Sequence, residues 1–225
     1  MRQTLSALLV TVLAGAAAAP ALGQTEALYR ESARYQACIG LAESDPDSAL
    51  DEAQTWLIEG GGWPAEVCEA RALIALGESG AGASALAAIA NRAPVGMVAA
   101  ERVELLTLAG ETWSGLGAGE DARNAFDDAL TLDPRAAAPL AGRAALSLQE
   151  EEWAALSRDA NQLIAIAPER ADGWYYRGEY RLQEDDYDGA WDDMSTARSH
   201  APQRIDILLL RGKINEARRL AAAAD

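Results

Sequence analysis

Residues 171–204 read ADGWYYRGEYRLQEDDYDGAWDDMSTARSHAPQR, and their pattern recurs in the two preceding segments of the same length. Pro134, Pro168 and Pro202 lie 34 residues apart, twice in succession, and each proline ends an apolar helical stretch. The three stretches are FDDALTLDP, ANQLIAIAP and MSTARSHAP. Self-similarity at this period is typical of a helix–turn–helix solenoid, in which each repeat packs against its neighbours.

The repeated segments resemble the tetratricopeptide repeat (TPR) family in where they place large, small and proline residues. That family has a large apolar residue at repeat position 4, small residues at positions 8, 20 and 27, and proline at position 32. Residues 171–204 match with Trp174, Gly178, Tyr187, Ala190, Met194, Ala197 and Pro202. Residues 103–136 match with Leu106, Gly110, Trp113, Ala122, Phe126, Ala129 and Pro134. Residues 137–170 match more loosely, with Leu140, Ala144, Trp153, Ala160, Leu163 and Pro168, and depart at position 20, where Leu156 stands.

The resemblance implies an all-α fold, a right-handed TPR-type solenoid of antiparallel helix hairpins with about five repeats plus a C-terminal capping hairpin. The clear repeats are residues 103–136, 137–170 and 171–204. Residues 30–61 and 64–94 are divergent repeats, and the capping hairpin is expected over 205–225. An alanine-rich composition with few β-branched residues favours such close-packed helices over strands.

The N-terminal residues have the pattern of an export signal. Arg2 is followed by the apolar stretch LSALLVTVLAGAAAA (5–19), which is too short to span a bilayer comfortably. Small residues before Gln24 predict cleavage there, with Ala19-Pro20-Ala21 as a second candidate site. We therefore expect a signal peptide over 1–23, a solenoid over 24–225, a periplasmic location and no stable membrane span after cleavage.

The two cysteines, Cys38 and Cys68, are predicted to form a disulfide. An even number of cysteines in an exported protein favours pairing, because the compartment is oxidising. The resemblance places both residues on the first helices of adjacent repeats, which pack side by side in this family. Two buried free thiols are the alternative.

Arginine and aspartate recur together in two of the clear repeats. Arg143 precedes Asp159 by 16 residues, and Arg177 precedes Asp193 by the same spacing. In residues 103–136 the equivalent positions are both alanine, so the two partners are present together or absent together. A half-buried charge without its partner costs several kcal/mol, and we predict structural ion pairs across each hairpin.

The acidic segment QEDDYDGAWDDM (183–194) invites a comparison with calcium loops. With Gly189 at position 6 of that template, the closing glutamate is replaced by Ser195. The repeat register instead places the segment at the turn between two helices, with Tyr187 and Ala190 packing inward. Its carboxylates are then expected to cap a helix N-terminus.

The chain lacks the residue arrangements that most enzymes and cofactor sites need. Its one histidine, His200, stands just before a proline, where we expect a surface or capping role. No HExxH, GxxxxGK[ST] or GxGxxG pattern marks a site, and the glycine-rich stretch GESGAGAS (77–84) lacks the phosphate-binding lysine. We expect no enzyme activity, no cofactor and no metal. A net charge of −16 also disfavours nucleic-acid partners.

In the TPR family the first helix of each repeat lines a concave groove through positions 2, 5, 9 and 12. The resemblance implies groove roles for Glu104, Thr107, Glu111 and Ser114, then for Ala138, Ala141, Ala145 and Leu148, then for Asp172, Tyr175, Glu179 and Leu182. Such a surface suits an extended or helical peptide with apolar anchors and basic flanks. The alternative is that these side chains only face solvent. The lysine and asparagine of the carboxylate clamp in cytosolic chaperone-binding members are missing, so that ligand is not expected.

The sequence therefore predicts a non-catalytic protein-binding scaffold or adaptor of the periplasm, with envelope assembly as a candidate role. The second hypothesis is a structural protein that assembles with copies of itself. Exposed apolar residues on the last helix would support it, and the candidates are Ile205, Ile207, Leu208 and Leu209. A homo-oligomer would show a concentration-dependent mass in solution.

Overall fold

The structure is a computed structural model that describes the backbone of residues 22–224 and the side chains of residues 32–223. Of the predicted signal peptide, residues 1–21 lie outside the described part, and residues 22–23 stand in the first turn of the first helix. Within residues 22–224, no helix has the length and apolar character needed to cross a membrane.

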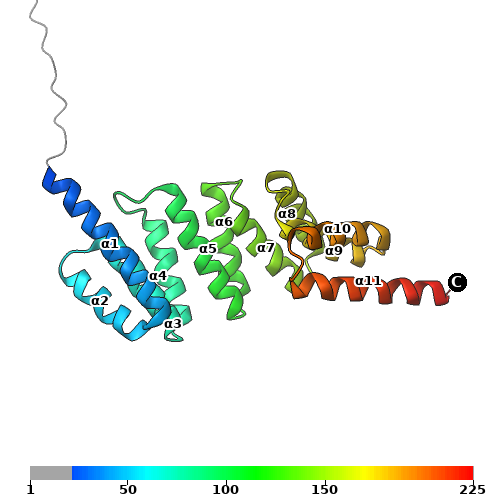
Figure 1. Ribbon diagram of the computed structural model, residues 1–225, viewed down its shortest axis with the longest axis horizontal. Coiled ribbons are helices and arrows are strands. Elements are labelled where there is room, and N and C mark those ends of the chain that lie inside the picture. The colour runs from blue at the N-terminus through cyan, green and yellow to red at the C-terminus, as the bar shows by residue number, and fades with distance from the viewer. Residues whose placement is uncertain (1–21, 225) are drawn as a thin grey trace, which may run out of the picture.

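The described residues form eleven α-helices and no strand. Their bounds are α1 (Leu22–Ser44), α2 (Pro46–Ile58), α3 (Gly62–Ala75), α4 (Ser79–Arg92), α5 (Ala99–Gly115), α6 (Gly119–Leu132), α7 (Ala137–Gln149), α8 (Trp153–Ile166), α9 (Ala171–Gln183), α10 (Tyr187–His200) and α11 (Ile205–Ala224). Consecutive helices pair into hairpins, and the hairpins follow one another along the long axis of the molecule (Figure 1). The predicted all-α solenoid of helix hairpins is confirmed. We name the odd-numbered helices A helices and the even-numbered ones B helices.

Four of the hairpin turns are built in the same way. Gly77, Gly117, Glu151 and Asp185 each adopt a positive φ, between 57° and 90°. The amide of each donates to the carbonyl three residues earlier, with N···O distances of 3.1–3.3 Å. The last three of these residues are 34 positions apart, whereas the first two are 40 apart. The turns therefore fix the register of every hairpin from α3 onward.

The acidic segment forms the last of these turns. Asp186 is the N-cap of α10, and its carboxylate accepts a hydrogen bond from the Gly189 amide at 3.0 Å. Ala190 is buried, but Tyr187 is only half-buried and its hydroxyl donates to Asp185 at 2.7 Å. The expectation that Tyr187 packs inward is therefore only partly met, because the turn carboxylate holds its hydroxyl at the surface.

The core contains small residues wherever helices cross closely. Phe126, on α6, is fully buried between Gly110 of α5 and Gly142 of α7. A Cβ atom at Gly110 would lie 2.6 Å from the phenyl ring, and one at Gly142 would lie 2.5 Å from it. These glycines let one large side chain fill the space between two hairpins, which the alanine-rich helices otherwise leave open.

A disulfide joins the first two hairpins, as the sequence predicts. Cys38 of α1 and Cys68 of α3 are bonded, with their Cα atoms 5.9 Å apart and both side chains buried. The bond closes a loop with a sequence separation of 30 residues between two A helices that pack side by side.

The C-terminal cap differs from the predicted hairpin, since residues 205–224 form the single helix α11. By the 34-residue register the helix would turn after Ala217, where the other hairpins have glycine or acidic residues. Here the sequence continues as RRLAAAA, whose residues are strong helix formers without turn chemistry. The helix therefore runs on past the neighbouring hairpin, as Figure 1 shows.

Candidate functional site

The A helices line a chain of hollows on one side of the solenoid. The hollow between α5 and α7 has a volume of about 400 Å³, and its lining includes Arg71, Glu104, Thr107, Glu111 and Ala138. A second hollow of about 350 Å³ lies between α7 and α9 and shares Glu111 and Ala138 with the first. The two hollows therefore form one continuous groove across three repeats.

The groove continues toward the N-terminus. Two further hollows, of about 340 and 300 Å³, lie among α1, α3 and α5. Arg71 borders both of them as well as the hollow between α5 and α7. Apolar and aromatic side chains that include Tyr35, Ile39 and Trp63 complete this end.

The structure brings most of the predicted groove residues together. The residues that line the hollows are Glu104, Thr107, Glu111, Ser114, Ala138, Ala141, Ala145 and Asp172. Leu148 and Leu182 are half-buried and do not line these hollows. Tyr175 and Glu179 have exposed fractions of only 8% and 5%. Tyr175 and Glu179 are therefore not part of the open groove, which corrects the prediction for these two residues.

Tyr175 and Glu179 are buried because α11 packs over them. Lys213 of α11 donates to the Glu179 carboxylate at 2.7 Å, and the Tyr175 hydroxyl is 3.3 Å from the same oxygen. The guanidinium of Arg204 lies 5.3 Å from the centre of the Tyr175 ring. Burial beside Glu179 also raises the pKa of Tyr175. The last A helix thus occupies the part of the groove that the sequence assigned to a ligand.

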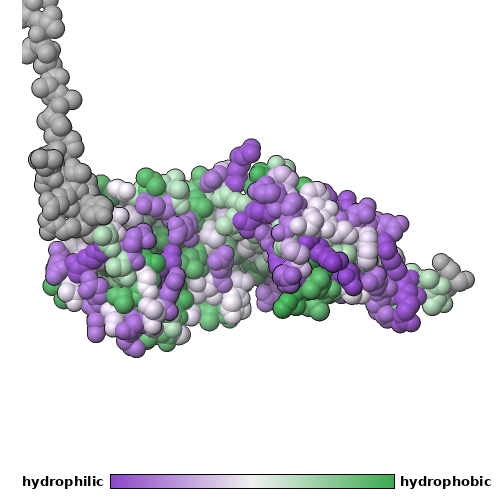
Figure 2. All heavy atoms as spheres, viewed as in Figure 1, coloured by the Kyte–Doolittle hydropathy of each residue, from purple (hydrophilic) through white to green (hydrophobic). Residues whose placement is uncertain are grey.

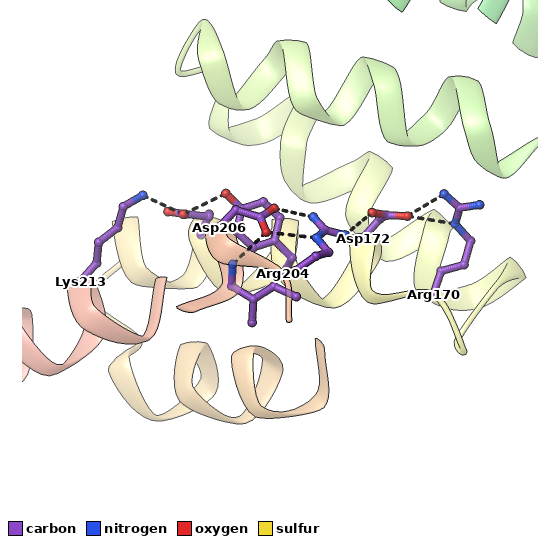
Figure 3. A network of polar contacts seen from close by, with 8 residues as sticks. Arg170, Asp172, Arg204, Asp206 and Lys213 are labelled. Carbon is purple, nitrogen blue, oxygen red and sulfur yellow. Dashed lines mark hydrogen bonds and ion pairs between the residues drawn. The ribbon is translucent and has the colours of Figure 1, made fainter. Parts of the chain in front are cut away.

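Arginine and aspartate residues extend this contact along the α9–α11 junction (Figure 3). Arg204 contacts Asp172 at 2.5 Å and Asp206 at 2.5 and 3.1 Å. Arg170 contacts the other side of the Asp172 carboxylate at 2.7 and 3.0 Å. The hydrogen bonds from Arg204 hold the pKa of Asp206 below its usual range. Because Arg204 joins aspartates of two successive repeats, the network fixes α11 on α9.

Arg71 is a groove residue that the sequence analysis missed. The turn residues Gly77 and Gly117 are 40 positions apart, so Arg71 is the equivalent of Glu111 at groove position 9. Its guanidinium is 3.0 Å from Glu104, while its Nε is buried without a hydrogen-bond partner among the described residues. A longer loop before α5 and an extra turn at the start of α5 shift the register by six residues, which hides this equivalence at a spacing of 34 residues.

Glu111 provides a carboxylate without a bound counter-charge at the centre of the groove. It borders both large hollows and makes no ion pair or side-chain hydrogen bond among the described residues. Partial desolvation raises the pKa of its carboxyl group. A cationic group of a ligand would relieve this cost, so Glu111 is the best-placed residue in the groove to bind one.

The arginines predicted to be structural lie at the hairpin interfaces. Arg143 binds Asp159 through Nε and Nη2, both at 2.8 Å, and Arg177 binds Asp193 in the same way at 2.8 and 2.7 Å. Arg143 also reaches Asp127 of the preceding hairpin at 2.5 Å. Each arginine therefore ties its own A helix to its B helix, and Arg143 ties two hairpins together as well.

Among the side chains of residues 32–223, no three histidine, cysteine or acidic residues cluster in a way that could hold a metal ion. His200 is exposed in the last turn of α10. The glycine-rich stretch 77–84 forms the turn into α4 and the first turns of that helix.

Comparison with known proteins places the fold. No protein-family model matches the sequence, and no curated protein matches it. Solved structures do match, among them the TPR protein YrrB, described as having an unusual peptide-binding site. It superimposes with a TM-score of 0.61 at 15% identity, over 87% of this chain and 100% of the other. The chain has the TPR fold.

Two further TPR proteins agree with this assignment. One from Parabacteroides merdae has a TM-score of 0.59 at 20% identity, over 68% of this chain and 59% of its own length. A thermophilic TPR protein from Thermus thermophilus has a TM-score of 0.54 at 21% identity, over 83% of this chain and 98% of the other. In the TPR fold the groove described above is the concave face of the A helices.

Proposed function

We propose that this protein is a non-catalytic scaffold that binds a segment of another protein in the groove formed by α3, α5, α7 and α9. The continuous pair of hollows around Glu111 carries the proposal. An open, elongated groove suits a chain segment, which can place successive side chains in successive hollows. The solved structure of YrrB, described by its peptide-binding site, supports such a role for this fold.

The chemistry of the groove indicates what the segment contains. Alanine side chains form the floor, at Ala137, Ala138, Ala141 and Ala145, so small or apolar side chains fit against it. Glu111 forms no ion pair among the described residues, and the chain as a whole carries a net charge of −16. The unpaired Glu111 carboxylate favours a basic residue of the ligand beside it, and the net negative charge of the chain attracts such a ligand over longer range.

Export to the periplasm is part of the proposal. The apolar stretch 5–19 after Arg2 has the composition of a signal peptide, and the Cys38–Cys68 disulfide agrees with an oxidising compartment. A scaffold at this location would act in assembling the cell envelope. Fractionation and N-terminal mass spectrometry would test the location, since a mature chain that begins at Gln24 is the expected product.

Site-specific photo-crosslinking would test the groove. A photoreactive amino acid at position 138, which lies in the lining of both large hollows, should crosslink a partner protein in intact cells. The same amino acid at position 120, on the exposed surface of α6, is the control and should not capture that partner. Glu111→Arg should abolish the crosslink at position 138, whereas Glu120→Arg should leave it intact.

The groove proposal fails if Glu111→Arg has no effect on the crosslink or if position 120 captures the same partner equally well. A crosslink only between two copies of this chain would favour the alternative, a self-assembling structural protein. That alternative draws on exposed residues of α11, namely Ile205, Leu208 and Leu209. Ile207, which the sequence analysis placed with them, is buried and does not contribute.

A further inference from the structure

The last helix, α11, repeats the pattern of an A helix although no B helix follows it within the described residues. Arg143, Arg177 and Arg211 are successively 34 positions apart, and Gly212 follows Gly178 by the same spacing. Asp206 and Lys213 likewise stand 34 positions after Asp172 and Glu179. Lys213 donates a hydrogen bond to Glu179, and Arg204 contacts both Asp172 and Asp206, so these contacts join the two repeats. α11 therefore has the residues that an A helix uses to bind its B helix.

The surface that a B helix would cover is open on α11. Leu106 and Leu140 are 1% and 0% exposed and Trp174 is half-buried, whereas Leu208, at the equivalent position of α11, is 42% exposed. A Cβ atom at Gly178 would contact Ala190 and Asp193 of α10, but one at Gly212 would have no atom within 4 Å. Figure 2 shows an apolar patch over the first turns of α11. We name the surface formed by Leu208, Arg211 and Gly212 the open slot.

Arg211 indicates the charge of what fills the open slot. Arg143 and Arg177 bind Asp159 and Asp193, which are 4% and 2% exposed. Arg211 is exposed and forms no ion pair or side-chain hydrogen bond within residues 32–223. An occupant that presents a carboxylate at the same place would form the bidentate pair found in the α7–α8 and α9–α10 hairpins.

The structure assigns to the open slot a partner of defined chemistry, which is an amphipathic helix of another protein with an aspartate or glutamate on its apolar face. The two B helices that face an arginine supply the template. Asp159 is followed by Ala160 and Leu163, and Asp193 by Met194 and Ala197, all of them buried. The occupant thus has an acidic residue followed by apolar residues one and four positions later.

Charge argues against a second copy of α11 as the occupant. Within α11, Lys213, Arg218 and Arg219 are paired with Glu179, Asp188 and Glu216, and Asp206 is paired with Arg204, so Arg211 is the charged side chain of α11 that forms no ion pair among the described residues. Two copies packed face to face at the open slot would bring two unpaired Arg211 side chains toward each other. A helix of a different polypeptide that places one carboxylate beside Arg211 would instead form an ion pair there.

A peptide of the chain's own α10, residues 185–201, provides a probe with the required pattern. Labelled with a fluorophore and titrated with the full chain, it should bind saturably as measured by fluorescence anisotropy. The peptide with Asp193→Asn should bind at least about fivefold more weakly, as should the unchanged peptide with an Arg211→Gln chain. Combining both changes should weaken binding no further, because each removes the same ion pair.

Two variants of the chain provide the controls. Leu208→Asp places a carboxylate among the apolar contacts and should abolish binding, whereas Arg158→Gln changes an arginine of α8, far from the slot in sequence, and should leave it unchanged. The assignment is overturned if the peptide shows no saturable binding, or if the chain binds the unchanged and the Asp193→Asn peptides equally. It is also overturned if sedimentation shows a dimer of the chain alone that Leu208→Asp dissociates, since a second copy would then fill the slot.

Discussion

Removal of Arg143 should destabilise the protein more than removal of its partner Asp159. The Asp159 carboxylate is almost fully buried, and among the described residues Arg143 is its only ion-pair partner, through two hydrogen bonds of 2.8 Å. Arg143→Ala leaves that charge buried and unpaired. Asp159→Ala leaves Arg143 with a second partner, Asp127, at 2.5 Å, and a side chain already 25% exposed.

The magnitudes follow from these surroundings. Breaking a buried ion pair from one side costs about 3–5 kcal/mol, and partial access of water to this pair reduces the expected cost of Arg143→Ala to about 2–4 kcal/mol. Asp159→Ala should cost about 1–2 kcal/mol, because its arginine remains paired and solvated. The double variant should also lose about 1–2 kcal/mol, since it leaves no uncompensated charge. Ala109 and Ala125 show that the solenoid accommodates two buried alanines at the equivalent positions.

Urea unfolding followed by far-ultraviolet circular dichroism measures the three variants against the wild type. Because repeat arrays can unfold in parts, tryptophan fluorescence should be recorded in parallel. Free energies of unfolding are compared only where the two signals give the same transition. The expected result is a coupling free energy of about 2–4 kcal/mol between the two substitutions, since the double variant should cost about as much as Asp159→Ala alone. If the double variant loses as much stability as the two single variants together, the pair is not coupled and the reasoning is refuted.

Three further predictions concern the disulfide, the core and the groove. Replacing both Cys38 and Cys68 with serine should lower the free energy of unfolding by about 3–4 kcal/mol, and a reductant should shift the urea midpoint of the wild type but not of the variant. Gly142→Ala should destabilise by about 1–3 kcal/mol in thermal unfolding, since its methyl group would overlap the Phe126 ring; an unchanged melting temperature would contradict the packing. Glu111→Gln should stabilise the chain at pH 7 and have no effect on stability at pH 3. The reason is that folding raises the pKa of the Glu111 carboxyl group, which therefore opposes folding only when it is ionised. Urea titrations at the two pH values measure this, and equal effects at both would refute it.

The repeat architecture could be predicted because its signals are local and recur. Proline and small residues at fixed spacing mark the hairpins, and the pairing of Arg143 with Asp159 follows from the joint presence or absence of the two residue types across repeats. The disulfide depended on one more step, that neighbouring A helices pack side by side. In each case a short stretch of sequence contains the interacting groups or fixes their spacing.

The open part of the groove could not be predicted in the same way, because exposure depends on what stacks on each helix. Tyr175 and Glu179 occupy groove positions in the repeat, yet α11 buries them through Lys213 and Arg204. Arg71 was missed because the loop from α4 to α5 has six residues where the later loops have four, and because α5 begins four residues earlier in its repeat than α7 does; together these displace the register by six. Counting from the positive-φ turn residues Gly77 and Gly117, rather than from the prolines, would have revealed it.

The last helix has two faces with opposite consequences for binding. Toward α9, Lys213 of α11 and Arg204, which directly precedes α11, neutralise Glu179 and Asp172, which closes the groove at that end. Away from α10 it leaves Arg211 and Leu208 open. A terminal repeat has a neighbour on one side only and is the least stable part of a solenoid, so an occupant of the open slot would also stabilise the contacts that close the groove. Binding at the slot and the boundary of the groove are therefore linked through α11 itself.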